Sequence, residues 1–447
     1  MLKTASVMLY YLKYRRRRDK GNRAAFDRWQ RRQVRRCVRR AARSIPYYRG
    51  MGKLPVDELP TMDKSRFMDS FSSLNRVGVA EKEAIGFALE GERARSFSDK
   101  LGRVSVGLSS GTSGRRGAFL VSDRERFMWA GFVLARLVPG ELLKGHRVAF
   151  FMRANSNLYQ AVASKRLRFE FFDILKPLDA HVERLNELDP TILVGQPSVL
   201  LELARMRASG QVGIDPGRLV SIAEVLEPQD EKRILEAFDV PFVHQVYQCT
   251  EGCLAVTCDH GSLHMNEDVV SVERSYLDDR RFSPIITDFT RRTQPIIRYR
   301  LDDVLVENAE PCPCGSCFLR LERIEGRLDD ALRFPAVGGG EIQVFPDIVR
   351  RCVLMAGEVS EYRVVQVPDG GLTVHASVGE DVRRSIRSEF ERLADAQGFE
   401  MPSLEFADYK PHGGGKMRRV ERRRADDSLS GEGSPTSVVN GSDRRTI

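Results

Sequence analysis

Long apolar runs and a dense cysteine framework are both missing from this 447-residue sequence. No apolar stretch approaches the roughly 18 residues that a membrane-spanning helix needs. The short run at 6–11 is too brief for the apolar core of a signal peptide. The eight cysteines are neither dense nor spread as a disulfide framework. We therefore expect a cytoplasmic protein.

The rest of the composition is that of a folded chain with about two to three domains. From 103 to about 325 short β-type runs alternate with helical ones, which predicts an α/β domain with mixed, largely parallel sheets. We expect strands at 148–152, 191–195, 219–225, 242–247 and 283–288, and helices at 179–188, 198–208 and 228–238.

The pattern changes after Gly326 to that of a small α+β domain, with helices at 347–356 and 382–397 and strands at 362–367 and 372–378. We predict a large domain over 51–326, which includes the helical segment 1–50, and a small mobile domain over 327–424. The tail 425–447 is rich in Ser, Gly and Asp, which is typical of disorder.

Positive charge is concentrated near the start of the chain. The net charge is +9, yet 13–43 alone holds 15 Lys or Arg against two Asp. Apolar residues recur there near helical spacing, which predicts an amphipathic helix with an arginine-rich face. Three roles remain open for that face: solvation of a helix packed on the domain, an acidic partner or anionic membrane surface, or nucleic acid.

A hydroxyl- and glycine-rich loop follows the strand expected at 103–108. It runs from Ser109 to Gly117, and its backbone amides, hydroxyls and arginines suit a phosphate group. The Walker pattern G-x-x-x-x-G-K-[ST] cannot be laid over it, which excludes a P-loop fold. An ordinary turn is the alternative.

Four later clusters are weak signals when taken singly. Thr250 and Glu251 follow an expected strand, where open α/β sheets bind ligands. Asp302 and Asp303 are carboxylates suited to ribose hydroxyls or to salt bridges at a strand edge. The segment 323–330 suits a hinge. Lys416 follows three glycines, from which a lysine can reach an anionic centre.

Taken together and in this order, the five clusters resemble those of the adenylate-forming superfamily of acyl- and aryl-CoA ligases. Within it, the chain is similar to phenylacetate-CoA ligases and to synthetases that adenylylate a deazaflavin coenzyme. The resemblance covers roughly 25–423 and implies an ATP-dependent enzyme with a large and a small domain.

The resemblance also implies a role for each matching residue. Glu251 would bind Mg²⁺, Thr250 would touch the α-phosphate, and Asp303 would take the ribose hydroxyls. Asp329 would be the pivot of the small domain, and Lys416 the catalytic lysine. The β- and γ-phosphates would be held by Ser109, Ser110, Gly111, Thr112, Ser113 and Gly114, and the adenine would be flanked by Tyr247, Ala223 and Glu224.

Two positions depart from the pattern of that superfamily. Asp302 stands where a glycine usually precedes the ribose aspartate, so either Asp302 or Asp303 is a candidate for the sugar contact. Arg115-Arg116-Gly117 replaces the usual end of the phosphate loop, which keeps positive charge but alters the sequence.

A set of cysteines and histidines predicts a structural zinc site. Three thiolates and one imidazole, from Cys258, His264, Cys312 and Cys314, are a suitable tetrahedral set, and four protein ligands leave no open position for water. The phenylacetate-ligase branch resembles this chain in having such a site. His260 or Cys317 could replace one ligand, and reduced cysteines packed in a turn are the alternative.

The resemblance implies that a carboxylic acid, with aromatic acids as candidates, reacts with ATP to give an acyl-adenylate and pyrophosphate. A thiol then takes the acyl group, with coenzyme A as the default. Loading of a carrier protein and release of an adenylylated product are the alternatives, followed by a non-catalytic nucleotide-binding or nucleic-acid-binding protein. Aromatic side chains at 152–159 and 169–172 are candidates for the acid pocket or for the core.

Overall fold

The computed structural model describes residues 2–16, 19, 21–94, 96, 99–109, 116–138, 145–152, 167–357, 359, 361–410 and 418–423. These residues divide into two units. One contains the described residues as far as Asp329, and the other contains Asp330–Lys410 together with 418–423. Within the described ranges, no helix is long and apolar enough to cross a bilayer.

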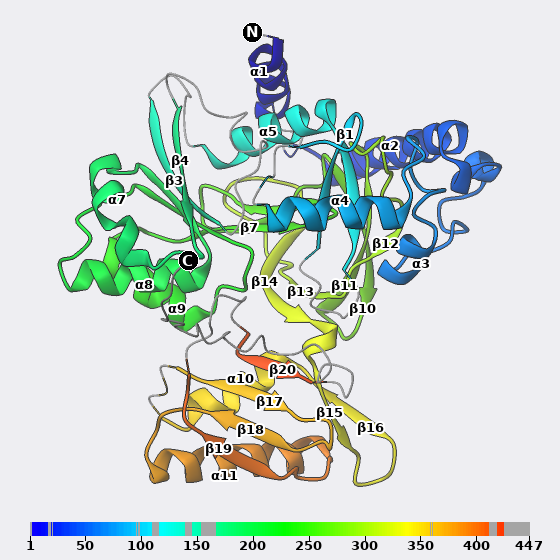
Figure 1. The fold of residues 1–447 in the computed structure, drawn as a ribbon. Coiled ribbons are helices and arrows are strands. Elements are labelled where there is room, and N and C mark those ends of the chain that lie inside the picture. Colours follow the sequence, from blue (N-terminus) through cyan, green and yellow to red (C-terminus); the bar gives the residue numbers. More distant parts are fainter. Residues whose placement is uncertain are drawn as a thin grey trace, which may run out of the picture. The chain divides into compact units, whose positions relative to one another are not determined.

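A 12-stranded sheet is the framework of the larger unit (Figure 1). Its parallel part runs in the order β4 (Leu167–Asp173), β3 (His146–Met152), β5 (Ile192–Gly195), β6 (Arg218–Ile222) and β7 (His244–Cys249). The pairing then becomes antiparallel through β8 (Gly252–Thr257), β9 (Leu263–Met265), β14 (Arg320–Arg327), β13 (Asp303–Glu307), β11 (Arg281–Asp288) and β10 (Val270–Tyr276). The short strand β12 (Tyr299–Arg300) pairs with β11, and β1 (Val104–Leu108) pairs with β2 (Ala118–Ser122) in a separate hairpin.

The predicted mixed α/β class is confirmed, and its parallel part ends at β7. The helices of this part are α5 (Asp123–Leu137), α7 (Val182–Leu188), α8 (Pro197–Ala208) and α9 (Pro228–Phe238). Proline at the first position of α8 and α9 suits a helix start, because the missing N–H would have no partner there.

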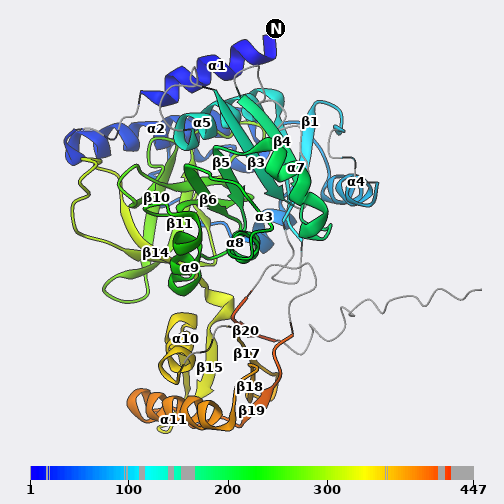
Figure 2. The same cartoon turned by 90° about the vertical axis from the view of Figure 1, so that its left-hand side faces the viewer.

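Apolar residues on both faces of the parallel strands explain why helices cover both sides. On β3, Ala149 and Phe151 join the cluster formed with α8 and α9, whereas Val148 and Phe150 join the cluster formed with α5. Successive strand residues point to opposite faces, so one strand contributes to two cores. Figure 2 shows α8 and α9 on the other side of these strands from α5.

The basic N-terminal segment contains two helices rather than the single helix predicted over 13–43. They are α1 (Leu2–Arg15) and α2 (Arg23–Ser44). Gly21 has φ 133°, and the side chain of Asn22 caps α2 by accepting from the amide of Ala24 at 2.8 Å. The apolar residues of α2 pack on the antiparallel part of the sheet, and its arginines remain on the other face.

The remaining described elements of the larger unit are the helices α3 (Lys64–Asp69) and α4 (Glu81–Arg93) and the short 3₁₀ turns η1 (Pro46–Tyr48), η2 (Met51–Lys53) and η4 (Leu178–His181). The turn η5 (Leu328–Asp330) includes the residues at which the division between the two units falls.

The smaller unit has its own sheet and core. The sheet order is β19 (Leu404–Ala407), β18 (Leu372–His375), β17 (Arg363–Gln366) and β20 (Val420–Arg422), and a hairpin is formed by β15 (Leu332–Pro335) and β16 (Glu341–Val344). Helices α10 (Pro346–Met355) and α11 (Glu380–Gln397) pack on it close to where the sequence predicts helices. Phe334 and Phe399 stack with ring centroids 4.5 Å apart in this core.

Candidate functional site

The ends of two neighbouring parallel strands carry the residues predicted to flank adenine. β6 and β7 pair with Ile222 opposite Val246, so Ala223 and Tyr247 come next along their strands. Glu224 follows directly. Ligands of open α/β sheets bind beyond the carboxyl ends of the strands, and these residues lie at that edge.

The backbone at Ala223 adopts a conformation that alanine rarely takes. Its φ is 68°, in the left-handed region that favours glycine. Such strain costs about 1–3 kcal/mol and clusters at ligand-binding sites. The next side chain is fixed, because Glu224 Oε2 accepts from the hydroxyl of Ser198 at 2.9 Å. The strain therefore coincides with the position predicted to face adenine.

The predicted ribose residue lies beside the predicted adenine residue. The Tyr247 hydroxyl donates to Asp303 Oδ2 at 2.5 Å. Burial raises the pKa of Asp303, while this hydrogen bond and the charge of Arg327 lower it. Asp302 Oδ2 lies 3.3 Å from Arg327 Nη2. Of the two candidate aspartates, Asp303 is the one that contacts Tyr247.

Thr250 and Glu251 form the two-residue turn between β7 and β8. The Thr250 hydroxyl donates to Glu251 Oε2 at 2.8 Å, and Arg291 Nη2 donates to the Thr250 carbonyl at 2.6 Å. Burial raises the pKa of Tyr299, and the charge of Glu251 raises it further. The Glu251 carboxylate thus lies among hydroxyl groups, and carboxylate oxygens are suitable ligands for Mg²⁺.

The base of the predicted phosphate loop is closed by its own backbone. The Ser109 amide donates to the Gly117 carbonyl at 2.8 Å, and the Gly117 amide donates to Ser109 Oγ at 2.7 Å. Arg116 pairs with Glu92 at 2.7 Å and donates to the Ser109 carbonyl at 3.1 Å. Arg116 is therefore engaged at the loop base, although the sequence suggests it as a source of charge for phosphate.

Several predicted residues fall outside the described part of the chain. Lys416 is one of them, and Asp329 contributes its backbone to the turn η5 while its side chain is not described. The others are the loop residues Ser110, Gly111, Thr112, Ser113 and Gly114.

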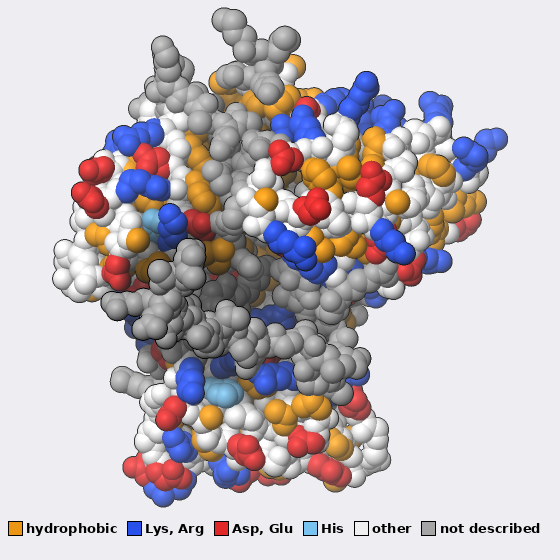
Figure 3. Space-filling model, in the orientation of Figure 1, with side chains coloured by type: hydrophobic (Ala, Val, Ile, Leu, Met, Phe, Trp, Pro, Cys, Tyr) orange, Lys and Arg blue, Asp and Glu red, His pale blue; other side chains and the backbone are white. Residues whose placement is uncertain are grey.

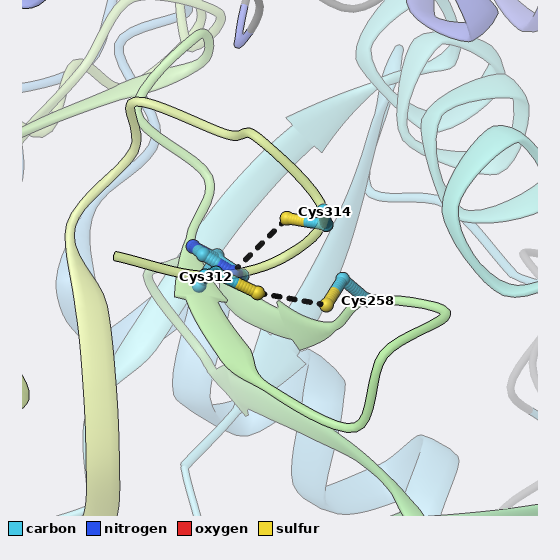
Figure 4. A group of neighbouring side chains, drawn as sticks. Cys258, Cys312 and Cys314 are labelled. Carbon is cyan, nitrogen blue, oxygen red and sulfur yellow. Dashed lines mark hydrogen bonds between the residues drawn. The ribbon is translucent and has the colours of Figure 1, made fainter. Parts of the chain in front are cut away.

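A separate cluster brings together the four predicted zinc ligands. The ligand atoms of Cys258, His264, Cys312 and Cys314 all lie within 4.8 Å of one another. Cys258 Sγ is 3.8 Å from Cys312 Sγ (Figure 4). Cys314 Sγ is 3.6 Å from His264 Nε2. Tetrahedral zinc with bonds of about 2.3 Å would hold two thiolates about 3.8 Å apart. The donor set and its spacing therefore fit zinc.

The surroundings of the cluster orient its histidine. His264 Nδ1 lies 3.3 Å from the Phe318 carbonyl, which leaves Nε2 directed at the sulfurs. This arrangement is common for a metal-bound imidazole. Neither His260 nor Cys317 belongs to the group that the described residues form. The backbone amide of His260 donates to Cys258 Sγ at 3.4 Å.

The aromatic run at 169–172 lies in β4, and residues 153–166 are outside the described ranges. Phe172 is fully buried and stacks on Phe151 with centroids 4.7 Å apart. Its position agrees with the alternative that these aromatics belong to the core.

Comparisons with known proteins agree with this architecture. No family model matches the chain. The chain is 26% identical over 243 residues to indoleacetate–lysine synthetase of Pseudomonas savastanoi, which covers 51% of this chain and 58% of that protein. It is 28% identical over 160 residues to protein CapK of Staphylococcus aureus, which covers 35% of each. The matched part of the chain thus spans about a third of the length of one relative and somewhat over half of the length of the other.

Among solved structures, 2-hydroxyisobutyryl-CoA ligase in a postadenylation state with R3-HIB-AMP superposes with a TM-score of 0.68. The match has 17% identity and covers 93% of this chain and 92% of that one. The chain has the fold of the adenylate-forming ligases. This confirms the predicted fold, while the branch within the superfamily stays a prediction.

Within this fold, the structure adds residues that the sequence did not single out. Arg291 holds the Thr250 carbonyl, and Arg327 lies beside both ribose candidates, 3.9 Å from Asp303 Oδ1. Glu125 accepts from the backbone amides of Arg292 and Thr293 at 2.6 and 2.9 Å. These contacts join segments far apart in the chain, and no local pattern marks them.

Proposed function

We propose that this chain is an AMP-forming ligase that activates a carboxylic acid with ATP and passes the acyl group to a nucleophile. The observation that carries the proposal is the convergence of Tyr247 and Asp303 beside the strained backbone of Ala223. Adenine and ribose are then recognised at adjoining strand ends. The turn residues Thr250 and Glu251 extend the same edge of the sheet.

The first half-reaction is an in-line displacement at phosphorus. An oxygen of the substrate carboxylate attacks the α-phosphorus, the bond to the bridging oxygen of the β-phosphate breaks, and pyrophosphate leaves. Asp303 would accept from the ribose hydroxyls, and Lys416 would neutralise the charge that develops at the α-phosphate. Positioning and electrostatics supply most of the catalysis in such a step. Glu251 would hold Mg²⁺, which supplies charge neutralisation of the phosphates.

The second half-reaction transfers the acyl group. A thiolate attacks the carbonyl carbon of the acyl-adenylate, the bond from that carbon to the phosphate oxygen breaks, and AMP leaves. Coenzyme A is the acceptor that we propose. A carrier-protein thiol is the alternative, and so is release of an adenylylated product.

We further propose that Cys258, His264, Cys312 and Cys314 bind a structural zinc ion. The spacing of their donor atoms supports this role, and four protein donors fill a tetrahedral shell. Such an ion would link the loop between β13 and β14 to the end of β8, two segments that are distant in the sequence. It would not take part in either half-reaction.

Pyrophosphate release from a panel of carboxylic acids, with and without coenzyme A, tests the proposed activity. We expect an acid-dependent release, with acyl-AMP and its thioester detected by mass. Lys410→Ala is a matched control for Lys416→Ala, because Lys410 is an exposed lysine in the same part of the chain. A rate of turnover that is the same with and without coenzyme A would favour an alternative acceptor. Absence of release with every acid, together with intact ATP binding, would favour a non-catalytic relative.

A further inference from the structure

A large groove in the larger unit lies outside the predicted ATP site. It lies among α1, α2, the first turns of α5 and the segment 289–293, and its volume is about 1230 Å³. None of the predicted ATP-binding or zinc-binding residues lines it. The proposed reaction therefore assigns no role to the groove.

The groove is lined mainly by positive charge. Eight cationic side chains face it, namely Lys13, Arg16, Arg36, Arg40, Arg76, Arg103, Arg124 and Arg292. The lining contains two carboxylates, and both are already engaged. Asp268 pairs with Arg136 at 2.5 Å, and Glu125 accepts from Ser122 and from the segment 292–293. The cations thus greatly outnumber the available anions.

Across the described residues, none of these eight cations forms an ion pair with a carboxylate. Arg40 donates to the Phe289 carbonyl at 3.1 Å, and Arg124 donates to the Tyr10 hydroxyl at 3.3 Å, so both meet neutral oxygens. Burial lowers the pKa of Arg292, and the charges of Arg40 and Arg124 lower it further. Mutual repulsion of this kind is relieved when an anion binds.

Large apolar side chains lie exposed beside these cations. One face of α1 packs on α5 through Val7, Tyr11 and Tyr14. The opposite face exposes Met8, Leu9 and Leu12, by 43%, 67% and 55%, and the two leucines also line the groove. Figure 3 shows Lys and Arg side chains gathered along the upper edge of the larger unit, with hydrophobic ones among them.

We propose that this face docks on a membrane surface that contains anionic phospholipids. The arginine groove takes the headgroup phosphates, and the exposed apolar side chains of α1 enter the interface between headgroups and acyl chains. Guanidinium groups suit phosphate oxygens because their donors form a planar fork. The site thus combines the two forces that hold peripheral proteins on anionic bilayers.

A nucleic acid is the other polyanion to consider, and the lining favours it less. Single strands bind through aromatic rings that are free to stack on bases. Here Trp29 and Phe289 pack against each other edge to face, with centroids 6.2 Å apart. The freely exposed groups are aliphatic instead, and aliphatic side chains partition into lipid.

Sedimentation of the full chain with vesicles tests the proposal. We expect binding to vesicles of phosphatidylcholine mixed with phosphatidylglycerol, and at least about tenfold weaker binding to phosphatidylcholine alone. Raising the salt concentration should weaken the binding, since exposed charges are screened. Equal binding to both kinds of vesicle, or no binding to either, overturns the proposal.

Paired variants distinguish the contribution of the groove to vesicle binding from that of charged or hydrophobic residues elsewhere on the surface. Arg40→Gln with Arg124→Gln, and Leu9→Ser with Leu12→Ser, should each weaken vesicle binding about tenfold or more. The matched controls are Arg233→Gln with Arg384→Gln, on α9 and α11, and Leu175→Ser, whose side chain is 50% exposed after β4. If a double variant fails to fold, Leu12→Ser alone decides, because this exposed residue tolerates a polar side chain. Groove variants that bind like the controls, or a single-stranded RNA that binds when vesicles do not, contradict membrane docking.

Discussion

The cysteine–histidine cluster and the predicted nucleotide site lie on the same sheet but differ in how closely their side chains are gathered. The donor atoms of the four cluster residues all lie within 4.8 Å of one another. The nucleotide site is spread over the ends of β6, β7 and β13, and it includes the strained backbone at Ala223. The first arrangement suits a permanent ligand, and the second suits a ligand that comes and goes.

This difference predicts separable effects of mutation. Changes in the cluster should lower stability and metal content but leave the chemistry of the folded protein intact. Changes in the nucleotide site should lower turnover and leave stability intact, because strained ligand-binding positions cost folding energy rather than provide it. A variant that lowers both would break the distinction.

The largest effect is expected from Lys416→Ala. Loss of one charge that stabilises the transition state costs about 10²–10³ in rate, so pyrophosphate release should fall roughly 10³-fold. ATP binding, zinc content and the melting temperature should stay close to those of the parent protein. Steady-state release assays and thermal melts measure this. Unchanged turnover in Lys416→Ala, with Lys410→Ala as the control, would contradict the proposed mechanism.

Cys312→Ser should produce the opposite pattern. We expect zinc to fall from about one ion per chain to well under one, and the free energy of unfolding to fall by about 3 kcal/mol, the value for a ligand present at about 100 times its dissociation constant. Metal analysis and denaturant melts measure both quantities. Cys317→Ser is the matched control, because Cys317 lies nearby but outside the cluster. Equal zinc in the two variants would overturn the ligand set.

The two aspartates next to β12 offer a sharper test within the nucleotide site. Asp303→Asn should raise the KM for ATP or lower kcat by about 30-fold in total, the effect of losing one charged hydrogen bond. Asp302→Asn should change either value less than about threefold, because Asp302 meets Arg327 rather than Tyr247. The reverse ranking would assign the ribose contact to Asp302.

Local patterns were enough to predict much of this molecule. Strand β5, which is buried throughout, and helices α8 and α9, which begin with proline, lie close to the positions predicted from the sequence. Donor chemistry and the family resemblance together name the four cluster residues, with His260 and Cys317 as alternatives, and the structure brings these four together. In the nucleotide site, Tyr247 and Asp303 were named from motifs, and their contact follows from the pairing of distant strands.

The remaining features depend on contacts that no local pattern records. The antiparallel strand β8 carries a short apolar run that resembles those of the parallel strands, so periodicity does not tell one pairing from the other. Strand β14 is mostly charged, so no apolar period marks it as part of the same sheet. The break between α1 and α2 rests on Gly21 and Asn22, two residues within a strongly basic run. Arg116 pairs with Glu92, a residue 24 positions away, and no local pattern marks this contact.

Among the variants expected to impair the nucleotide site, Tyr247→Phe should have the smallest effect, and it shows most clearly in the pH profile. Asp303 must be ionised to accept from ribose, and burial raises its pKa while the Tyr247 hydrogen bond lowers it. Removing the hydroxyl therefore raises the pKa of Asp303 further, and the acidic limb of kcat/KM for ATP should move to higher pH. Above that limb the loss should be less than about tenfold, since one hydrogen bond contributes about 1 kcal/mol. Tyr276→Phe is the control, because its hydroxyl also donates to a carboxylate, that of Glu307, but on an exposed part of β10. An acidic limb that stays in place in Tyr247→Phe would mean that a group other than Asp303 governs it.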